Sequence, residues 1–160
     1  MGIAALTALA VIALRLILFY TGHPPEGADF MIVHFLAAIT VVFFIDHRAL
    51  SSDLRTPFPD LMRDGFKGAA LYALLYGAFI WIYYTTVEDG YFAQRVESMV
   101  QSGLAEGQPE EVIRPRLTKF FTPFNYASIT FFTLLLVGAF DALLVGLLHH
   151  KVLRRFRSRS

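Results

Sequence analysis

The chain has 160 residues, of which 56% are hydrophobic, 15% are aromatic and 17% are charged. A soluble domain is typically about 45–50% apolar and about 25% charged, so this composition indicates a membrane protein. The formal net charge of +1 gives no electrostatic indication of nucleic-acid binding, and we predict no nucleic-acid partner. The absence of cysteine excludes a disulfide framework and a thiolate metal site.

The first apolar run, residues 2–20, lacks the features of a cleaved secretory signal. No basic residue precedes the run, Arg15 interrupts it, and no small-residue cleavage site follows Phe19. We therefore expect a retained helix over this run.

Three more apolar runs follow, and each approaches the length of a membrane span. A helix needs about 20 apolar residues to cross a bilayer core of about 30 Å. The four runs cover residues 2–20, 30–45, 68–87 and 125–148. Together they leave too little polar surface to cover a soluble core. The sequence therefore predicts an all-α integral membrane bundle of four transmembrane helices, as a single membrane domain over residues 1–160.

Basic residues are distributed unevenly among the connections. Nine Lys and Arg residues lie in the second connection and the C-terminal tail (46–67 and 151–160), against four in the first and third connections (21–29 and 88–124). Loops rich in Lys and Arg stay in the cytoplasm. We therefore predict that both termini are cytoplasmic and that the third connection faces outward.

The third connection contains a helical pattern of its own, over residues 90–121. Apolar side chains recur at helical spacing from Tyr91 to Leu104, with polar side chains on the other side. Residues 107–109 should break this helix, and Pro115 should kink or stop the helix that follows. We predict an extracytoplasmic amphipathic segment that lies on the membrane or caps the bundle. Structural packing is the simpler role, and a partner-docking or lipid-sensing surface is the alternative.

Small residues recur at four-residue intervals in the third and fourth runs. Such stripes let helices in lipid approach closely. They predict helix-packing seams, either within one chain or between the chains of a homodimer. The residues are Ala69, Ala73 and Gly77 in the third run, and Gly138, Ala142 and Gly146 in the fourth.

Three ionisable residues lie within the runs: Arg15, His34 and Asp141. A charged side chain at the centre of a membrane helix costs about 2.5–3.5 kcal/mol on insertion scales, so intramembrane charges often mark functional sites. Arg15 and Asp141 lean toward each other in depth and are candidates for an ion pair or an ion path. In the structural alternative, Arg15 reaches an interface, His34 bonds a carbonyl or a tyrosine hydroxyl, and Asp141 is neutral.

Catalytic and metal-binding patterns are weak. His149 and His150 have no third ligand at suitable spacing, and Asp46 with His47 has no accompanying nucleophile, so both pairs are interpreted as interface residues. We predict no metal, no cofactor and no enzymatic activity. Tail residues with basic side chains should bind anionic lipid head groups: Lys151, Arg154, Arg155 and Arg157.

The fourth run begins after a dense local pattern, FFTPFNY at 120–126. Pro123 cannot continue a preceding helix, and Thr122 or Asn125 can cap the next one. We interpret this pattern as the entry turn of the last span rather than as a ligand site.

Several of these stretches resemble one known family. They are DGFKG at 64–68, YF at 91–92, EE at 110–111, FFTPFNY at 120–126 and Gly138-Ala139 before a basic tail. Together they resemble a bacterial membrane family classified as domain of unknown function 4199, over nearly the whole chain. The resemblance implies four transmembrane helices in the bacterial inner membrane. It implies no activity, and Asp141 stands where that family is expected to have a small or polar residue.

Three functions are compatible with these features. The first is an accessory or scaffolding membrane protein that acts through a membrane-protein partner or a homodimer. The second is a transporter or channel component that uses Arg15, His34 and Asp141. The third is an interfacial lipid-binding protein with the outer segment as a lid. The sequence favours the first, with membrane lipids as the surroundings in every case.

Overall fold

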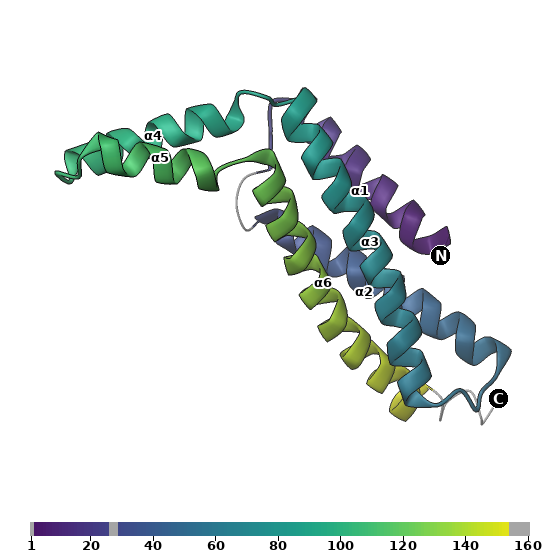
Figure 1. The fold of residues 1–160 in the computed structure, drawn as a ribbon. Helices are drawn as coiled ribbons and strands as arrows, with labels where there is room; N and C mark the ends of the chain where they lie inside the picture. Colours follow the sequence, from purple (N-terminus) through teal and green to yellow (C-terminus); the bar gives the residue numbers. More distant parts are fainter. Residues whose placement is uncertain (1, 26–28, 154–160) are drawn as a thin grey trace. The chain divides into compact units, whose positions relative to one another are not determined.

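The computed structural model describes residues 2–25 and 29–153, which form six α-helices and a short π-helical turn, with no strand among them (Figure 1). The fold is therefore all-helical, as predicted. The helices are α1 (Gly2–Tyr20), α2 (Asp29–Ser52), α3 (Phe58–Thr86), α4 (Tyr91–Ala105), α5 (Glu110–Phe120) and α6 (Pro123–Leu148), followed by the π-helical turn η1 (His149–Leu153).

Four helices in the described part of the chain are long and apolar enough to cross a membrane, the number that the sequence predicts. Their apolar segments have 19 residues in α1, 23 in α2, 29 in α3 and 30 in α6 with the turn that continues it. A crossing needs about 20 residues. The chain is thus built as a multi-pass membrane protein.

Two of these helices have a clear cap at one end. Helix α1 ends in a glycine cap, and α6 begins with a side-chain cap. Gly22 follows α1 with a φ of +78°, and the N–H groups of Gly22 and His23 donate to the carbonyls of Phe19 and Leu18. This pairing closes the helix in the Schellman manner, which suits glycine. At α6, the hydroxyl of Thr122 accepts a hydrogen bond from the backbone N–H of Asn125 at 3.1 Å. Of the two predicted caps, Thr122 is therefore the one used.

The chain forms two compact units, and the smaller one comprises Gly77–Phe131. An aromatic cluster joins the helices of this unit. The ring of Tyr84 lies 4.9 Å from that of Phe92 and 5.2 Å from that of Tyr126. The end of α3 is thereby packed against the starts of α4 and α6.

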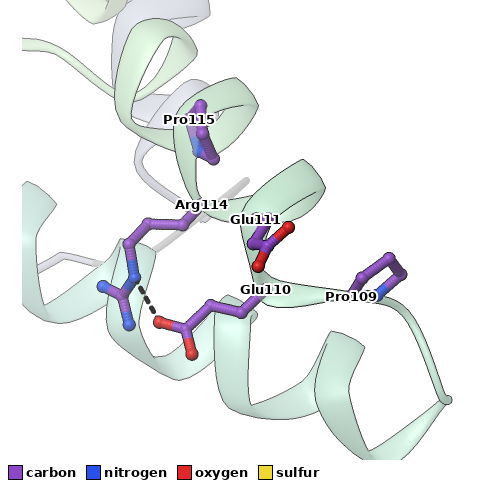
Figure 2. Close-up of a pocket in the computed structure, with 5 residues that line it drawn as sticks. All are labelled: Pro109, Glu110, Glu111, Arg114 and Pro115. Carbon is purple, nitrogen blue, oxygen red and sulfur yellow. Dashed lines mark hydrogen bonds and ion pairs between the residues drawn. The ribbon is translucent and has the colours of Figure 1, made fainter.

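Helices α4 and α5 pack against each other within this unit. Gly103 of α4 permits the approach, because a Cβ atom there would lie 2.7 Å from Cδ1 of Ile113 on α5. Arg114 of α5 pairs with Glu110 at 2.6 Å and with Glu97 of α4 at 2.9 Å. The first of these pairs is drawn in Figure 2.

The break between α4 and α5 lies where it was predicted, at residues 106–109. Gly107 has a φ of +80°, and Gln108 N–H donates to the carbonyl of Gly103. Pro115, however, does not stop α5, which continues to Phe120. Proline frees only the carbonyl four residues earlier, that of Glu111. Both residues are exposed, so water can hydrogen-bond this carbonyl.

The larger unit comprises Met1–Tyr76 and Phe132–Ser160. Its core contains Val42 of α2, Ala69 of α3, and Ala142 with Val145 of α6. Gly138 lies against Ala69 so closely that a Cβ atom on the glycine would be 2.5 Å from that of the alanine. Backbones that approach this closely require small residues.

Both α2 and α3 are longer than the predicted spans. The second run was expected to end at residue 45, but α2 continues to Ser52, because residues 46–52 contain neither proline nor glycine. The third run was expected to begin at residue 68, but α3 begins at Phe58, directly after Pro57. The polar connection predicted over residues 46–67 is therefore mostly helical.

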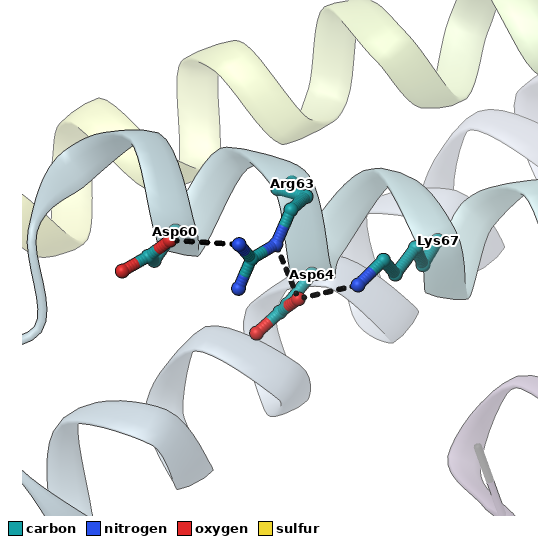
Figure 3. A network of polar contacts seen from close by, with 4 residues as sticks. All are labelled: Asp60, Arg63, Asp64 and Lys67. Carbon is teal, nitrogen blue, oxygen red and sulfur yellow. Dashed lines mark hydrogen bonds and ion pairs between the residues drawn. The ribbon is translucent and has the colours of Figure 1, made fainter.

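Ion pairs along the start of α3 explain why so polar a segment is helical. Arg63 contacts Asp60 at 3.1 Å and Asp64 at 3.2 Å, and Lys67 contacts Asp64 at 3.2 Å (Figure 3). Asp60 with Arg63 and Asp64 with Lys67 are three positions apart and are neighbours on the helix surface, so these two pairs favour the helix. Leu61, on the same turns, is buried and joins the segment to the core.

Candidate functional site

All three intramembrane candidates are buried in the larger unit. The exposed fractions are 6% for Arg15, 4% for His34 and 0% for Asp141. Buried ionisable groups in apolar helices need partners or a functional reason. What surrounds each side chain therefore decides its role.

His34 has a direct partner. Its Nδ1 atom lies 2.6 Å from the hydroxyl oxygen of Tyr72, a short hydrogen bond between α2 and α3. Its ring also lies 4.2 Å from the ring of Tyr76 and 5.1 Å from that of Phe30. This is the tyrosine partner anticipated in the structural alternative for His34.

Arg15 joins the same aromatic group from α1. Its guanidinium carbon lies 5.7 Å from the centre of the Phe30 ring, within the range of a cation–π interaction. Arg15 continues the buried face of α1 after Ala8 and Val11. Arg15, Phe30, His34, Tyr72 and Tyr76 thus form one group, here called the aromatic–histidine cluster.

Asp141 is not paired with Arg15. Neither of its carboxylate oxygens has a hydrogen-bond partner in the described part of the chain, and no ion pair reaches it there. The ion pair considered from the sequence is therefore absent, because Arg15 is directed at Phe30 on α2 instead. Asp141 is a fully buried carboxyl group without a partner among the described residues.

A second buried polar pair was not singled out from the sequence. Asp46 of α2 is 0% exposed and His149 of η1 is 1% exposed, and Oδ2 of Asp46 lies 3.8 Å from Nδ1 of His149. The π-helical turn that begins at His149 is a rare conformation, often found at functional sites. We call Asp46 and His149 the Asp–His pair.

One signal in the sequence could have revealed Asp46. Val42, Asp46 and Leu50 follow each other at four-residue intervals, and all three are 0% exposed. A helix places such residues on one face. An acidic residue in line with two aliphatic ones points into the core rather than into an interface.

The predicted packing residues are all buried, and neighbours within the chain occupy the space beside them. Gly146 lies against Phe58 and Asp46, and Gly77 lies against Phe131. The small residues of α3 and α6 thus pack against other residues of the same chain, and these helix faces are buried. Of the predicted lipid-binding residues, Lys151 is exposed, while Arg154, Arg155 and Arg157 lie outside the described residues.

The described residues include no group of three His, Asp or Glu side chains arranged to hold a metal ion. A hollow of about 520 Å³ lies at the start of α5, lined by Pro109, Glu110, Glu111, Arg114 and Pro115 (Figure 2). Most of these residues are exposed, so the hollow is an open surface feature.

Outside the candidate membrane spans, Glu97 of α4 is held in its charged form by its neighbours. Hydrogen bonds from Arg114 and Gln101 hold the pKa of Glu97 below its ordinary value.

No family model matches this chain, and no curated protein or solved structure matches it either. The resemblance described from the sequence stays a prediction. The functional proposal for this chain therefore rests on its buried polar side chains.

Proposed function

We propose that this chain is a small transporter or channel component that passes protons through a bundle of four membrane-spanning helices. The observation that carries this proposal is Asp141, a fully buried carboxyl group that receives no hydrogen bond from any described residue. An acidic group in this setting is costly as a carboxylate, so it is suited to binding a proton or another small cation. Arg15 on α1 and His34 on α2 are also buried and supply further polar groups in the same unit.

The proposal includes an orientation. The apolar helix faces contact lipid, as their large exposed side chains suggest: Leu6, Ile32, Phe132 and Leu136 are 61–73% exposed. Both termini lie in the cytoplasm of a bacterium, with the chain in its inner membrane, as the excess of basic residues in the second connection and tail suggests. Lys151 and the basic tail then meet anionic lipid head groups.

In this orientation α4 and α5 form the amphipathic segment on the outer side. Phe92, Val96 and Val100 are buried on one face of α4, while Arg95, Glu97 and Gln101 are exposed on the other.

Proton flux in liposomes tests this function. Purified protein is reconstituted around a trapped pH-sensitive dye, and a potassium gradient with valinomycin provides the driving force. We expect proton entry with the wild-type protein and a loss of about tenfold or more with Asp141→Asn. Asp64→Asn is the matched control, because Asp64 is a partly exposed acid that pairs with Arg63 and Lys67.

Two results would contradict the proposal. One is the absence of flux with correctly folded wild-type protein. The other is equal flux with the wild-type protein and Asp141→Asn.

An accessory or scaffolding role is the second candidate, favoured by one observation on α5. This helix has no buried residue, and a hollow of about 340 Å³ lies between Ile113, Arg116, Leu117 and Phe120. Apolar side chains around a hollow suit contact with a membrane-protein partner. Mild-detergent purification from the native host tests this role, which requires a stoichiometric partner that is lost with Leu117→Asp.

A further inference from the structure

The Asp–His pair combines complete burial with a short separation between two titratable groups. The carboxylate of Asp46 and the imidazole of His149 are 3.8 Å apart, within ion-pair distance but beyond a hydrogen bond. Neither carboxylate oxygen of Asp46 accepts a hydrogen bond from the described residues. The imidazole of His149 is thus within ion-pair distance of an acid that accepts no hydrogen bond from the described residues.

The hydrogen bonding of His149 fixes one of its protons. Nδ1 of His149 lies 3.2 Å from the backbone carbonyl of Val145. A carbonyl oxygen can only accept, so Nδ1 carries a hydrogen in this geometry. The ring is then neutral with Nε2 bare and cationic with Nε2 protonated. The charge state of His149 is thus set by a single further proton.

Apolar groups lie against both members of the pair. The Phe43 ring lies 4.7 Å from the His149 ring. Two glycines bring bare helix backbone against the carboxylate: a Cβ atom on Gly65 would lie 3.4 Å from Oδ1 of Asp46, and one on Gly146 would lie 3.7 Å from Oδ2. A net charge in such surroundings is strongly disfavoured.

The elements packed around the pair carry other titratable groups. Asp64 on α3 acts on Asp46 electrostatically, and its own charge is partly balanced by pairs with Arg63 and Lys67. The remaining titratable or charged side chains on these elements are Asp29, His34 and the exposed His47 and Arg48 on α2, Asp60, Tyr72, Tyr76, Tyr83 and Tyr84 on α3, and Tyr126, Asp141, His150 and Lys151 on α6 and η1.

We propose that Asp46 and His149 together form a site that binds one proton, carried either by the Asp46 carboxyl group or by Nε2 of His149. The site is either an aspartic acid beside a neutral imidazole or a carboxylate beside an imidazolium, and both forms have zero net charge. Loss of this proton to water leaves a net charge of −1, and uptake of a second leaves +1, so the apolar surroundings favour the singly loaded state. A role of the pair in loading transported protons rests on the proposed function. Proton binding by the pair does not depend on that function.

Two spectroscopic measurements on the full chain in lipid nanodiscs count this proton. Infrared spectroscopy detects a protonated carboxylic acid, and Asp46→Asn identifies the band of Asp46 by its loss. Nitrogen NMR of labelled histidine distinguishes neutral from cationic imidazole, and His149→Gln identifies the signal of His149. Asp60→Asn is the control that should change neither signal, because Asp60 is a partly exposed acid that pairs with Arg63.

At neutral pH we expect one of the two groups to be protonated in the wild-type protein: either the Asp46 acid band or the His149 imidazolium signal. In His149→Gln, the Asp46 acid band should be present, because an isolated buried acid keeps its proton. An ionised Asp46 beside a neutral His149 would overturn the proposal, as would protonation of both groups. An ionised Asp46 in His149→Gln would also overturn it.

The number of protons bound by Asp46 and His149 is measured independently of proton transport. If the pair holds one proton but the liposomes show no flux, the proposed function fails while the proton-binding site stands. If flux is present and the pair holds no proton or two protons, the function stands and this site is wrong. Should Asp46→Asn fail to fold, the wild-type protein and His149→Gln still give the count between about pH 5 and about pH 8.

Discussion

The Nδ1 atom of His34 lies 2.6 Å from the hydroxyl oxygen of Tyr72, and this hydrogen bond joins α2 to α3 in the buried interior of the larger unit. Both side chains are almost fully buried, with exposed fractions of 4% and 1%. Removal of one partner therefore leaves a buried polar group without this hydrogen bond.

Tyr72→Phe should therefore destabilise the protein. Hydrogen bonds between membrane helices are worth about 0.6 kcal/mol on average and about 1.7 kcal/mol at most, and the stranded His34 nitrogen places this one toward the upper end. Unfolding in detergent micelles measures the loss. Tyr20→Phe, at a tyrosine that is 74% exposed, is the control and should have little effect. Equal stabilities of the two variants would contradict the prediction.

Gly138→Ala should also destabilise the larger unit, through crowding. The added Cβ atom would lie 2.5 Å from that of Ala69, so α3 and α6 would have to separate. Overpacking of this kind costs about 1–3 kcal/mol. The double variant with Ala69→Gly removes the opposing methyl group and should recover most of the lost stability. A double variant as unstable as Gly138→Ala would show that the contact is not responsible.

Thr122→Ala should weaken the start of α6. The hydroxyl of Thr122 accepts the N–H of Asn125 at 3.1 Å, and loss of such a cap costs about 0.5–2 kcal/mol. Hydrogen exchange at the backbone amides of residues 124–126 should accelerate. Thr118→Ala, at an exposed position of α5, leaves this cap intact and should leave the exchange unchanged.

Acid should loosen the contact between α4 and α5. Arg114 holds the pKa of Glu97 below its ordinary value through a hydrogen bond, so their pairing is complete above about pH 4.3, the usual pKa of a glutamate, and is lost as the pH falls further. Hydrogen-exchange protection of α4, corrected for intrinsic rates, should fall over that acid range. The effect should be small and weaker in high salt, because both side chains are exposed. Glu97→Gln should abolish this pH dependence, and its persistence in that variant would assign it to another group.

Much of the helical structure follows from local sequence. The four apolar runs, the break at Gly107 and the start of α6 after Thr122 each depend on a few neighbouring residues. The ends of α2 and α3 were misjudged because polarity was taken to end a helix. Asp46 to Ser52 and Phe58 to Lys67 are polar, yet they remain helical and each contributes a buried residue to the core.

The arrangement of the polar residues depends on contacts that no local pattern contains. Depth in the membrane made Arg15 and Asp141 plausible partners, but depth does not specify which way each side chain faces around its helix. Arg15 faces Phe30 of α2. Asp46 and His149 lie far apart in the chain at the ends of apolar runs, so their approach is visible only once α2 and α6 are packed.

The absence of cysteine allows a direct test of the four membrane crossings, on which the functional account depends. Single cysteines are introduced at exposed positions, Ser98→Cys on α4, Ser52→Cys at the end of α2 and Lys151→Cys after α6, and intact cells are treated with a membrane-impermeant maleimide. We predict that Ser98→Cys is labelled at once, and that Ser52→Cys and Lys151→Cys are labelled only after the membrane is opened. Labelling of all three from the same side would contradict the four crossings, and the reverse pattern would contradict the orientation.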